Sequence, residues 1–381
     1  MLRQEPHHWD AIVVGGGLAG GAAACQLARA GKKTLLIEKQ KHAHHKVCGE
    51  FLSFEAQQYL AELGIDAIQL GAAPLRFVRI HHGRRSALAR LPFIGQGLSR
   101  FLLDEQLLAR AAGYGVTIQR GCKVSSIEPA GEHWRVEAKD RYGAQADTVF
   151  LATGKHDFPT LKRRAGTQND FIGFKMHFFC ATAQRQALAE HVEIFLFNGG
   201  YSGLQLIEDG KANLCLVVTR QRFARIGRDW RALLAYIAGS CIAFREFLDR
   251  ATPCWRRPAA ITGLPYGFVH AGTGGEETEG ADSIYRLGDQ FAVIPSFCGE
   301  GMSIALHTAR LAVSEFTIDG NRAACFHARA FAELSPQIDV ASRLGRAFDK
   351  PMVQSLGVAA CRLFPGLMNK AAARTRLRAF G

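Results

Sequence analysis

One short stretch near the N-terminus constrains the fold more than any other part of the chain, because it joins two strands, a glycine turn and a helix. Residues 11–14 are fully apolar, residues 15–20 follow at once with the spacing Gly-x-Gly-x-x-Gly, and the alanine-rich residues 22–30 favour a helix. A second apolar run over residues 34–37 ends on Glu38. This order predicts a parallel βαβ unit that binds a dinucleotide.

Each glycine of the turn has its own physical role. Gly15 permits the tight turn, Gly17 lets the backbone approach a pyrophosphate, and Gly20 lets the helix pack closely on the sheet. The helix N-terminus offers free N–H groups and the positive end of a dipole. Glu38 stands where a carboxylate accepts hydrogen bonds from ribose hydroxyls, and its charge would repel a 2′-phosphate. FAD or NAD therefore fits this turn, whereas NADP does not.

The pattern changes character further along the chain. Strand-like and helical segments alternate through residue 165, and antiparallel-looking strands separated by turn signals fill residues 171–218. We expect an α/β fold: a three-layer, Rossmann-type FAD-binding domain with a parallel sheet, an inserted antiparallel-sheet substrate domain, and C-terminal helices. The expected parts are 1–165 (FAD-binding domain, with 65–100 able to join the substrate domain), 166–280 (substrate domain), 281–318 (return segment) and 319–381 (helical region).

Composition narrows the classes of function. The chain has 381 residues, of which 48% are hydrophobic and 21% charged, as is typical of a globular protein. No apolar run is as long as a membrane span, and the polar first nine residues lack the centre of a signal peptide, so we expect a cytoplasmic protein. Ten scattered cysteines favour free thiols over disulfides. The net charge is +13 without any nucleic-acid-binding motif, so we expect no nucleic-acid partner.

Several separated motifs together resemble a known family. The turn at 15–20 with Glu38, the pair Thr153-Gly154 closing a strand, the pair Gly288-Asp289, and residues 295–301 occur in the order found in FAD enzymes of the para-hydroxybenzoate hydroxylase fold. Residues 46–50, 173–177 and 200–203 are similar to the geranylgeranyl reductase branch, which includes lipid double-bond reductases as well as halogenase-like and hydroxylase-like relatives. The resemblance extends nearly to Phe316.

The resemblance implies FAD as the cofactor and indicates where FAD would bind. Asp289 would hydrogen-bond a ribityl hydroxyl, Arg100 would reach the cofactor, and the helix that starts near Gly301 would stabilise negative charge on the flavin pyrimidine ring. The expected FAD-binding residues are Gly15, Gly17, Leu18, Ala19, Gly20, Glu38, Lys39, Lys46, Cys48, Gly49, Arg100, Val124, Thr153, Gly154, Asp289, Pro295, Gly299, Glu300, Gly301 and Met302.

The sequence also departs from the hydroxylase pattern. The Asp-Gly pair that usually follows the Thr153-Gly154 position is absent, and no second glycine-rich βα unit exists, since residues 272–275 precede acids and indicate a surface loop. The electron donor is therefore left open between NAD(P)H, docked on the basic residues 162–164, and a separate reductase protein. The Trp-x-Trp-x-Ile-Pro signature of tryptophan halogenases is missing, which argues against halogenation.

The aromatic-rich strands suggest a substrate pocket, because in this fold their sheet roofs the substrate cavity. The candidate substrate residues are Phe174, Lys175, His177, Phe195 and Tyr201. Catalytic residues are not identified. His42, His44 and His45 lack partners at ligand spacing, so a solvated or phosphate-facing loop is favoured over a metal site. Cys48 is either a small packed residue, which we favour, or a thiol whose pKa Lys46 lowers.

The expected function is that of an FAD-dependent oxidoreductase for a hydrophobic small molecule, such as a polyketide, isoprenoid or lipid. Hydroxylation by a monooxygenase is slightly favoured over double-bond reduction of the geranylgeranyl reductase type. A flavoprotein maturation partner that modifies another protein is the alternative from a different class. Residues 350–381 contain no acid and are basic with interleaved apolar residues. They suit either a docked helix with a solvated basic face or a peripheral contact with anionic membrane.

Overall fold

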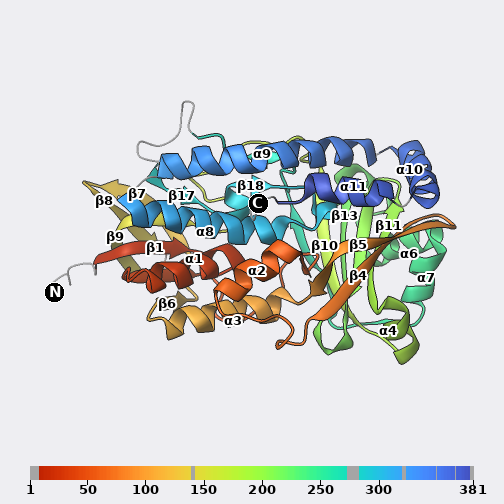
Figure 1. Cartoon of the computed structure of the whole chain (residues 1–381), viewed down its shortest axis with the longest axis horizontal. Helices are drawn as coiled ribbons and strands as arrows, with labels where there is room; N and C mark the ends of the chain where they lie inside the picture. Colours follow the sequence, from red (N-terminus) through yellow and green to blue (C-terminus); the bar gives the residue numbers. More distant parts are fainter. Residues whose placement is uncertain are drawn as a thin grey trace.

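The computed structural model describes residues 8–138, 142–272, 283–319, 323–348, 350–364 and 366–377. The loop predicted at residues 272–275 lies outside these ranges apart from Gly272. Two sheets stand at opposite ends of an elongated molecule, and long helices run between them (Figure 1).

The first sheet contains the predicted parallel unit. Its strands follow the order β6-β2-β1-β9-β8-β7, and β17 pairs with β9. Strands β6, β2, β1, β9 and β17 run parallel to one another, whereas β8 pairs antiparallel with both β9 and β7. The bounds are β1 (His8–Val14), β2 (Thr34–Glu38), β6 (Thr117–Arg120), β7 (Val124–Ala130), β8 (His133–Ala138), β9 (Tyr142–Leu151) and β17 (Tyr285–Arg286).

Helices cover this sheet through small and apolar side chains. Ala22, Ala23 and Ala24 are fully buried, and their small size lets α1 lie close to the strands. Helix α1 also packs against α3 and α8, so three segments far apart in the sequence share one core (Figure 1). The bounds are α1 (Leu18–Arg29), α2 (Phe54–Glu62), α3 (Arg100–Gly113) and α8 (Gly301–Asp319).

The second sheet is mostly antiparallel and has the order β14-β10-β13-β12-β11-β4-β5-β3, with β15 on β10. Strand β4 pairs in parallel with β11, so the 65–100 segment contributes two long strands to the sheet of residues 171–219. The bounds are β3 (Phe51–Leu52), β4 (Ala73–His82), β5 (Arg85–Gly97), β10 (Phe171–Phe179), β11 (Glu190–Phe197), β12 (Gly200–Leu206), β13 (Ala212–Thr219), β14 (Thr252–Pro253) and β15 (Ala259–Thr262).

One face of the second sheet packs on short helices. Two of these helices follow one another within residues 230–248 and are separated at Cys241, whose extended backbone ends the first. Strand β17 of the first sheet is only two residues long, because Gly288 at φ +56° starts a 3-10 turn. The remaining bounds are α4 (Thr182–Leu188), α5 (Arg220–Arg225), α6 (Trp230–Ser240), α7 (Ile242–Leu248), β16 (Phe268–Val269), β18 (Ala292–Val293) and the 3-10 turns η1 (Glu208–Gly210), η3 (Gly288–Gln290) and η4 (Ser296–Cys298).

Three helices form the C-terminal part of the chain. Helix α9 (Ala323–Phe348) runs along its length, and α10 (Pro351–Leu363) and α11 (Gly366–Thr375) pack on β5 of the second sheet (Figure 1). Within the described ranges, no helix combines the length and the apolar character needed to cross a membrane.

Candidate active site

A cavity of about 640 Å³ extends from the glycine turn after β1 to the inner face of the second sheet. Loops at the carboxyl ends of the parallel strands line one end, which is where open α/β sheets bind ligands. Strands β4, β5, β11, β12 and β13 and helices α9, α10 and α11 line the other end. We call the whole space the cavity and its second half the substrate end.

The turn after β1 has a shape that requires glycine. Gly15 has a φ of +112°, and a Cβ there would lie 2.4 Å from the carbonyl oxygen of Ala152. A Cβ on Gly20 would lie 1.9 Å from the carbonyl oxygen of Gly15, so α1 could not approach β1. Helix α1 starts after Gly17 with no side-chain cap and no acid in its first turn. Its N-terminal N–H groups are therefore suited to an anion.

Two cations converge on this helix N-terminus. A Cβ on Gly17 would lie 3.2 Å from Nζ of Lys46 and 3.4 Å from a guanidinium nitrogen of Arg100. Asp104 holds both cations, accepting hydrogen bonds of 2.7 Å from Lys46 Nζ and from Arg100 Nε. Burial by itself raises the pKa of Asp104, but Arg100 and Lys46 hold it below its ordinary value, so the carboxyl stays ionised. Two positive charges against one negative charge leave a net attraction for a diphosphate.

Glu38 ends β2 beside the same turn and is buried. Its Oε2 accepts the backbone N–H of Gly16 at 2.7 Å, and its Oε1 accepts the N–H of Gln40 at 2.8 Å. These bonds fix the carboxylate, and each oxygen retains a lone pair for a ribose hydroxyl.

Asp289 lies in the 3-10 turn after β17. Its Oδ2 is 3.6 Å from Nζ of Lys155, and Lys155 also donates to the carbonyl oxygen of Val47 at 3.1 Å. Burial by itself lowers the pKa of Lys155, but Asp289 helps to raise it above its ordinary value. Lys155 therefore joins three loops that meet at the cavity, each from a different part of the sequence.

The loop before α8 carries a buried acid. Gly299 has a φ of +75°, and a Cβ there would lie 2.9 Å from the ring of Phe51. The next residue, Glu300, is 1% exposed, and its Oε2 has no hydrogen-bond partner. Burial and the neighbouring Glu55 raise the pKa of Glu300 to about 7. The N-terminus of α8, which starts at Gly301, also lines the cavity.

The residues present fit FAD. A Cβ at Gly15, Gly17 or Gly20 would fill the space at the turn after β1. The N-terminus of α1, together with Lys46 and Arg100, suits a diphosphate. A second helix N-terminus, that of α8, lies at the same cavity and suits the flavin ring. The cavity volume is within the range of small-molecule sites.

The structure brings most of the expected FAD residues together. Two of them do not line the cavity: Gly20, which packs α1 on the turn, and Pro295, which borders a smaller neighbouring pocket. The expected FAD residues that line the cavity are Gly15, Gly17, Leu18, Ala19, Glu38, Lys39, Lys46, Cys48, Gly49, Arg100, Val124, Thr153, Gly154, Asp289, Gly299, Glu300, Gly301 and Met302.

The expected substrate residues mostly lie elsewhere. Among them only Tyr201 lines the cavity. Phe174 packs on Phe223 and Trp230 beneath the outer helices, and Phe195 packs on Phe244 in the same core. The structure therefore does not place Phe174 and Phe195 at the substrate end, because strand alternation turns them to the helix-covered face.

Lys175 and His177 also fail to line the cavity, and both bind Glu50 instead. Lys175 Nζ donates to Glu50 Oε1, and His177 Nε2 lies 2.7 Å from Glu50 Oε2. Burial by itself raises the pKa of Glu50, but Lys175 and His177 outweigh it and hold the pKa below its ordinary value. Glu50 also accepts the backbone N–H of Arg100 at 2.7 Å, so this buried cluster braces the loop that faces the cofactor site.

The substrate end is predominantly apolar. Its polar groups include a hydroxyl cluster in which Ser296 Oγ lies 2.6 Å from the Tyr201 hydroxyl and 2.9 Å from the Tyr266 hydroxyl. Burial raises the pKa of both tyrosines, so their hydroxyls stay protonated. Apolar lining residues include Val78, Ile80, Leu91, Phe93, Val192, Ile194, Val217, Ile261, Leu264, Phe297, Leu344, Phe348, Leu367 and Met368.

Sequence reasoning missed several residues of the site. Asp104 could have been found from its i,i+4 spacing to Arg100 on one helix. Lys155 directly follows the Thr153-Gly154 pair, and its place next to that motif is the signal that could have found it. Tyr266 and the lining of α11 carry no local signal, since only the tertiary fold brings them to the cavity.

The histidine loop and Cys48 border the cavity. His44, His45 and Cys48 line it, and His45 stacks on Phe101 and Trp255 at centroid distances of 4.9 and 4.2 Å. Burial, with Lys175 and His177, lowers the pKa of His45 to about 4, so its imidazole is neutral at pH 7. Cys48 is a free cysteine whose Sγ accepts the backbone N–H of Glu50 at 3.4 Å.

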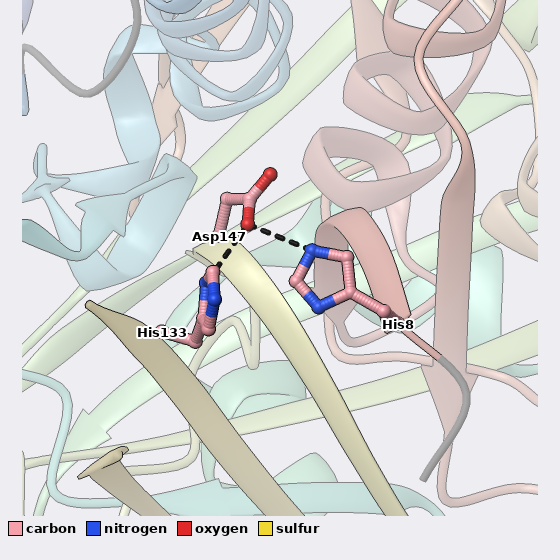
Figure 2. Close-up of side chains that lie close together, drawn as sticks. All are labelled: His8, His133 and Asp147. Carbon is pink, nitrogen blue, oxygen red and sulfur yellow. Dashed lines mark ion pairs between the residues drawn. The ribbon is translucent and has the colours of Figure 1, made fainter. Parts of the chain in front are cut away.

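A separate cluster lies at the edge of the first sheet, outside the cavity lining. Figure 2 shows His8 and His133 turned toward Asp147, with His8 Nε2 at 2.8 Å and His133 Nδ1 at 3.0 Å from the same carboxylate oxygen. In the described part of the chain this is the group with metal-ligand spacing, and all three side chains are exposed. The ion pairs account for its geometry without an ion.

Comparison with known proteins agrees with the site. The family model described as pyridine nucleotide-disulphide oxidoreductase matches residues 12–188. Menaquinone reductase of Mycobacterium tuberculosis is 25% identical over 365 residues, covering 89% of this chain and 81% of that protein. A flavoprotein/dehydrogenase structure from Cytophaga hutchinsonii superposes with a TM-score of 0.78 at 16% identity, over 98% and 94% of the two chains. The halogenase PltM in complex with phloroglucinol and FAD gives 0.71 at 14% identity, over 96% and 85%.

Fold, site and comparisons together define the class: the protein is an FAD-dependent oxidoreductase, and therefore an enzyme. Among the proteins just described, the mycobacterial menaquinone reductase is similar in sequence over 89% of this chain.

Proposed function

We propose that the protein reduces a double bond of a hydrophobic, prenylated small molecule, as in the geranylgeranyl reductase type. The observation that supports this most directly is the predominantly apolar substrate end, which is continuous with the cofactor site. Similarity to a menaquinone reductase over most of the chain supports the same class of substrate.

The residues that line the cavity have different expected roles. Bound FAD would supply the electron pair for the reduction, and an external two-electron donor such as NADPH or a reductase protein would restore it. Side chains such as Val78, Leu91 and Ile194 would enclose the apolar part of the substrate and exclude water. The two hydrogen bonds of the Tyr201–Ser296–Tyr266 cluster use two of its three hydroxyl protons, so one hydroxyl would be left to donate a hydrogen bond to a quinone or phenol oxygen.

Hydroxylation remains a second candidate for one specific reason. Ser296, which lies on the loop before α8, joins Tyr201 and Tyr266 in one hydroxyl cluster at the cavity, and this cluster could orient a phenolic ring toward the cofactor. Both candidates use the same cavity, so only the product distinguishes them.

The deciding experiment uses FAD-loaded protein, a chemical reductant and a prenylated naphthoquinone, with and without oxygen. Mass spectrometry should show a product with two added hydrogen atoms that forms without oxygen. A product with one added oxygen atom, formed only in air, would replace reduction with hydroxylation.

A matched pair of variants ties the activity to the cavity. Leu91→Trp fills the substrate end and should abolish turnover while FAD binding persists, because Leu91 lines that end. Leu88→Trp adds the same ring at an exposed position of the same strand and should leave turnover unchanged. Equal turnover in the two variants would show that the substrate binds elsewhere.

A further inference from the structure

The outer surface of α10 and α11 exposes large apolar side chains in an unusual density. We call this surface, residues 350–374 without the undescribed Pro365, the α10–α11 face. Leu363 and Phe364 are 74% and 65% exposed at the junction of the two helices. The other exposed large apolar residues of the face are Met352, Leu356 and Leu367. Such a concentration on a soluble surface marks a contact with an apolar partner.

The charged residues of the α10–α11 face are all basic. The sequence has no Asp or Glu after Asp349. Lys350, Arg362, Lys370 and Arg374 are exposed, and no ion pair joins them to any residue in the described ranges. Apolar side chains surrounded by unpaired cations are typical of elements that lie in the interface of an anionic bilayer.

The same helices form a wall of the cavity. Cys361, Met368, Ala372 and Thr375 line the substrate end from the inner side of α10 and α11. Leu367 lines the cavity and is also 43% exposed, so the cavity approaches the molecular surface at this face. One layer of helix therefore separates the apolar interior of the cavity from the apolar outer surface.

We propose that the α10–α11 face docks on the surface of an anionic lipid membrane and that the hydrophobic substrate enters the cavity beside α11. This inference rests on the proposed function for the nature of the substrate, but the docking itself does not. A second copy of the chain is a poor occupant, because symmetric pairing would bring like charges of two basic faces together. A lipid bilayer with acidic headgroups satisfies both the apolar and the charged residues.

The test measures sedimentation of the full FAD-loaded protein with vesicles. Binding to vesicles of phosphatidylglycerol and phosphatidylcholine should exceed binding to phosphatidylcholine alone, and salt should weaken it. Leu363→Ser with Phe364→Ser, and separately Lys370→Glu with Arg374→Glu, should each weaken anionic-vesicle binding about tenfold or more. None of these four side chains lines the cavity.

Matched controls carry the same chemical change elsewhere. Ile68→Ser removes an equally exposed apolar side chain, and Lys162→Glu with Arg164→Glu reverses two exposed cations away from the face. Both controls should bind vesicles like the parent protein. Equal loss in the controls and the face variants, or no vesicle binding by the parent protein, would overturn the proposal.

Two further readouts separate the alternatives. If analytical ultracentrifugation shows a dimer that Leu363→Ser with Phe364→Ser converts to a monomer, the face is a contact between copies and the docking proposal fails. Turnover of a detergent-dispersed substrate should persist in all face variants. Vesicle binding without any turnover would instead reject the proposed function and leave the docking surface standing.

Discussion

At the scale of single residues, the site depends on acids whose surroundings differ sharply. Asp104 and Glu50 are buried beside cations and have lowered pKa values, whereas Glu300 is buried beside Glu55 and has a raised one. Asp289 is partly exposed and faces Lys155. The same side-chain chemistry thus gives fixed anions near the diphosphate site and a titrating group at the start of α8.

Replacing Asp289 with Ala should weaken FAD binding about tenfold or more, because a ribityl hydroxyl would lose its acceptor and Lys155 its counter-ion. Flavin fluorescence titration of the apo-protein measures the dissociation constant. Asp209→Ala, at an exposed turn outside the cavity lining, should leave the affinity unchanged. An unaltered affinity in Asp289→Ala would mean that this turn does not contact the cofactor.

Replacing Glu300 with Gln should stabilise the apo-protein at neutral and alkaline pH. The pKa of Glu300 in the folded protein is about 7, above the ordinary 4.5. The stabilisation that the bound proton gives to the folded state is therefore fully present below pH 4.5 and is lost as the pH rises through 7. The variant should gain up to about 3 kcal/mol over the parent at pH 8 and almost nothing at pH 4. Urea unfolding at both pH values measures this difference, with exposed Glu128→Gln as the control. A gain that does not depend on pH would contradict the raised pKa.

At the scale of elements, strand β10 has two faces with different tasks. Phe174, Met176 and Phe178 pack under the outer helices, while Lys175 and His177 hold Glu50 in the loop before β3. This connection links the second sheet to the loop that lines the cofactor site. Lys175 and His177 on this strand therefore hold the loop in place, whereas the sequence predicted that they would contact substrate.

Replacing Lys175 with Met should destabilise the fold by about 3–5 kcal/mol, because it leaves the fully buried Glu50 carboxylate without its main cation. Adding Glu50→Gln to this variant should recover part of the loss, since the uncompensated charge is then removed. Lys211→Met breaks an exposed pair with Asp209 and should cost less than about 1 kcal/mol. Denaturant unfolding compares the variants. A cost for Lys175→Met as small as that for Lys211→Met would disprove this role of the cluster.

At the scale of the whole molecule, the two sheets and the C-terminal helices enclose a single continuous cavity, with the predicted FAD-binding residues at one end. The described ranges contain one glycine turn of the dinucleotide-binding kind, at Gly15, Gly17 and Gly20. Arg163 is one of the basic residues that the sequence suggested for NADPH docking. Its side chain is only 1% exposed and pairs with Asp157. Among the described residues, a second glycine turn of this kind, which could hold a nicotinamide cofactor in a fixed pose, is therefore not found.

We accordingly expect slow flavin reduction by NADPH or NADH alone, and faster reduction when substrate or a separate reductase is added. Anaerobic stopped-flow absorbance at the flavin band measures the rate. Chemical reduction of the same sample confirms that the bound flavin is competent. Fast, saturable bleaching by NADPH without substrate or partner would contradict the expectation.

Short sequence motifs were enough to predict the parallel strands of the first sheet and the glycine turn of the expected cofactor site. The βαβ unit, its glycines and Glu38 depend on neighbours within one turn or one strand, so their roles follow from residue types and spacing. The motifs around Thr153, Asp289 and Gly299 were predicted from the resemblance to the para-hydroxybenzoate hydroxylase fold, and all three line the cavity at the carboxyl edge of the parallel strands.

Only the tertiary structure decided which residues face the substrate. Strand periodicity shows that Phe174 and Lys175 point to opposite sides, but it does not show which side the helices α6 and α7 cover. Lys175 and His177, which bind the Glu50 carboxylate, lie more than a hundred residues away from it, and α11 reaches the cavity only because it packs on β5. Long-range packing assigns such contacts, since a buried charge or an apolar helix face is stabilised by whichever segment the fold brings against it.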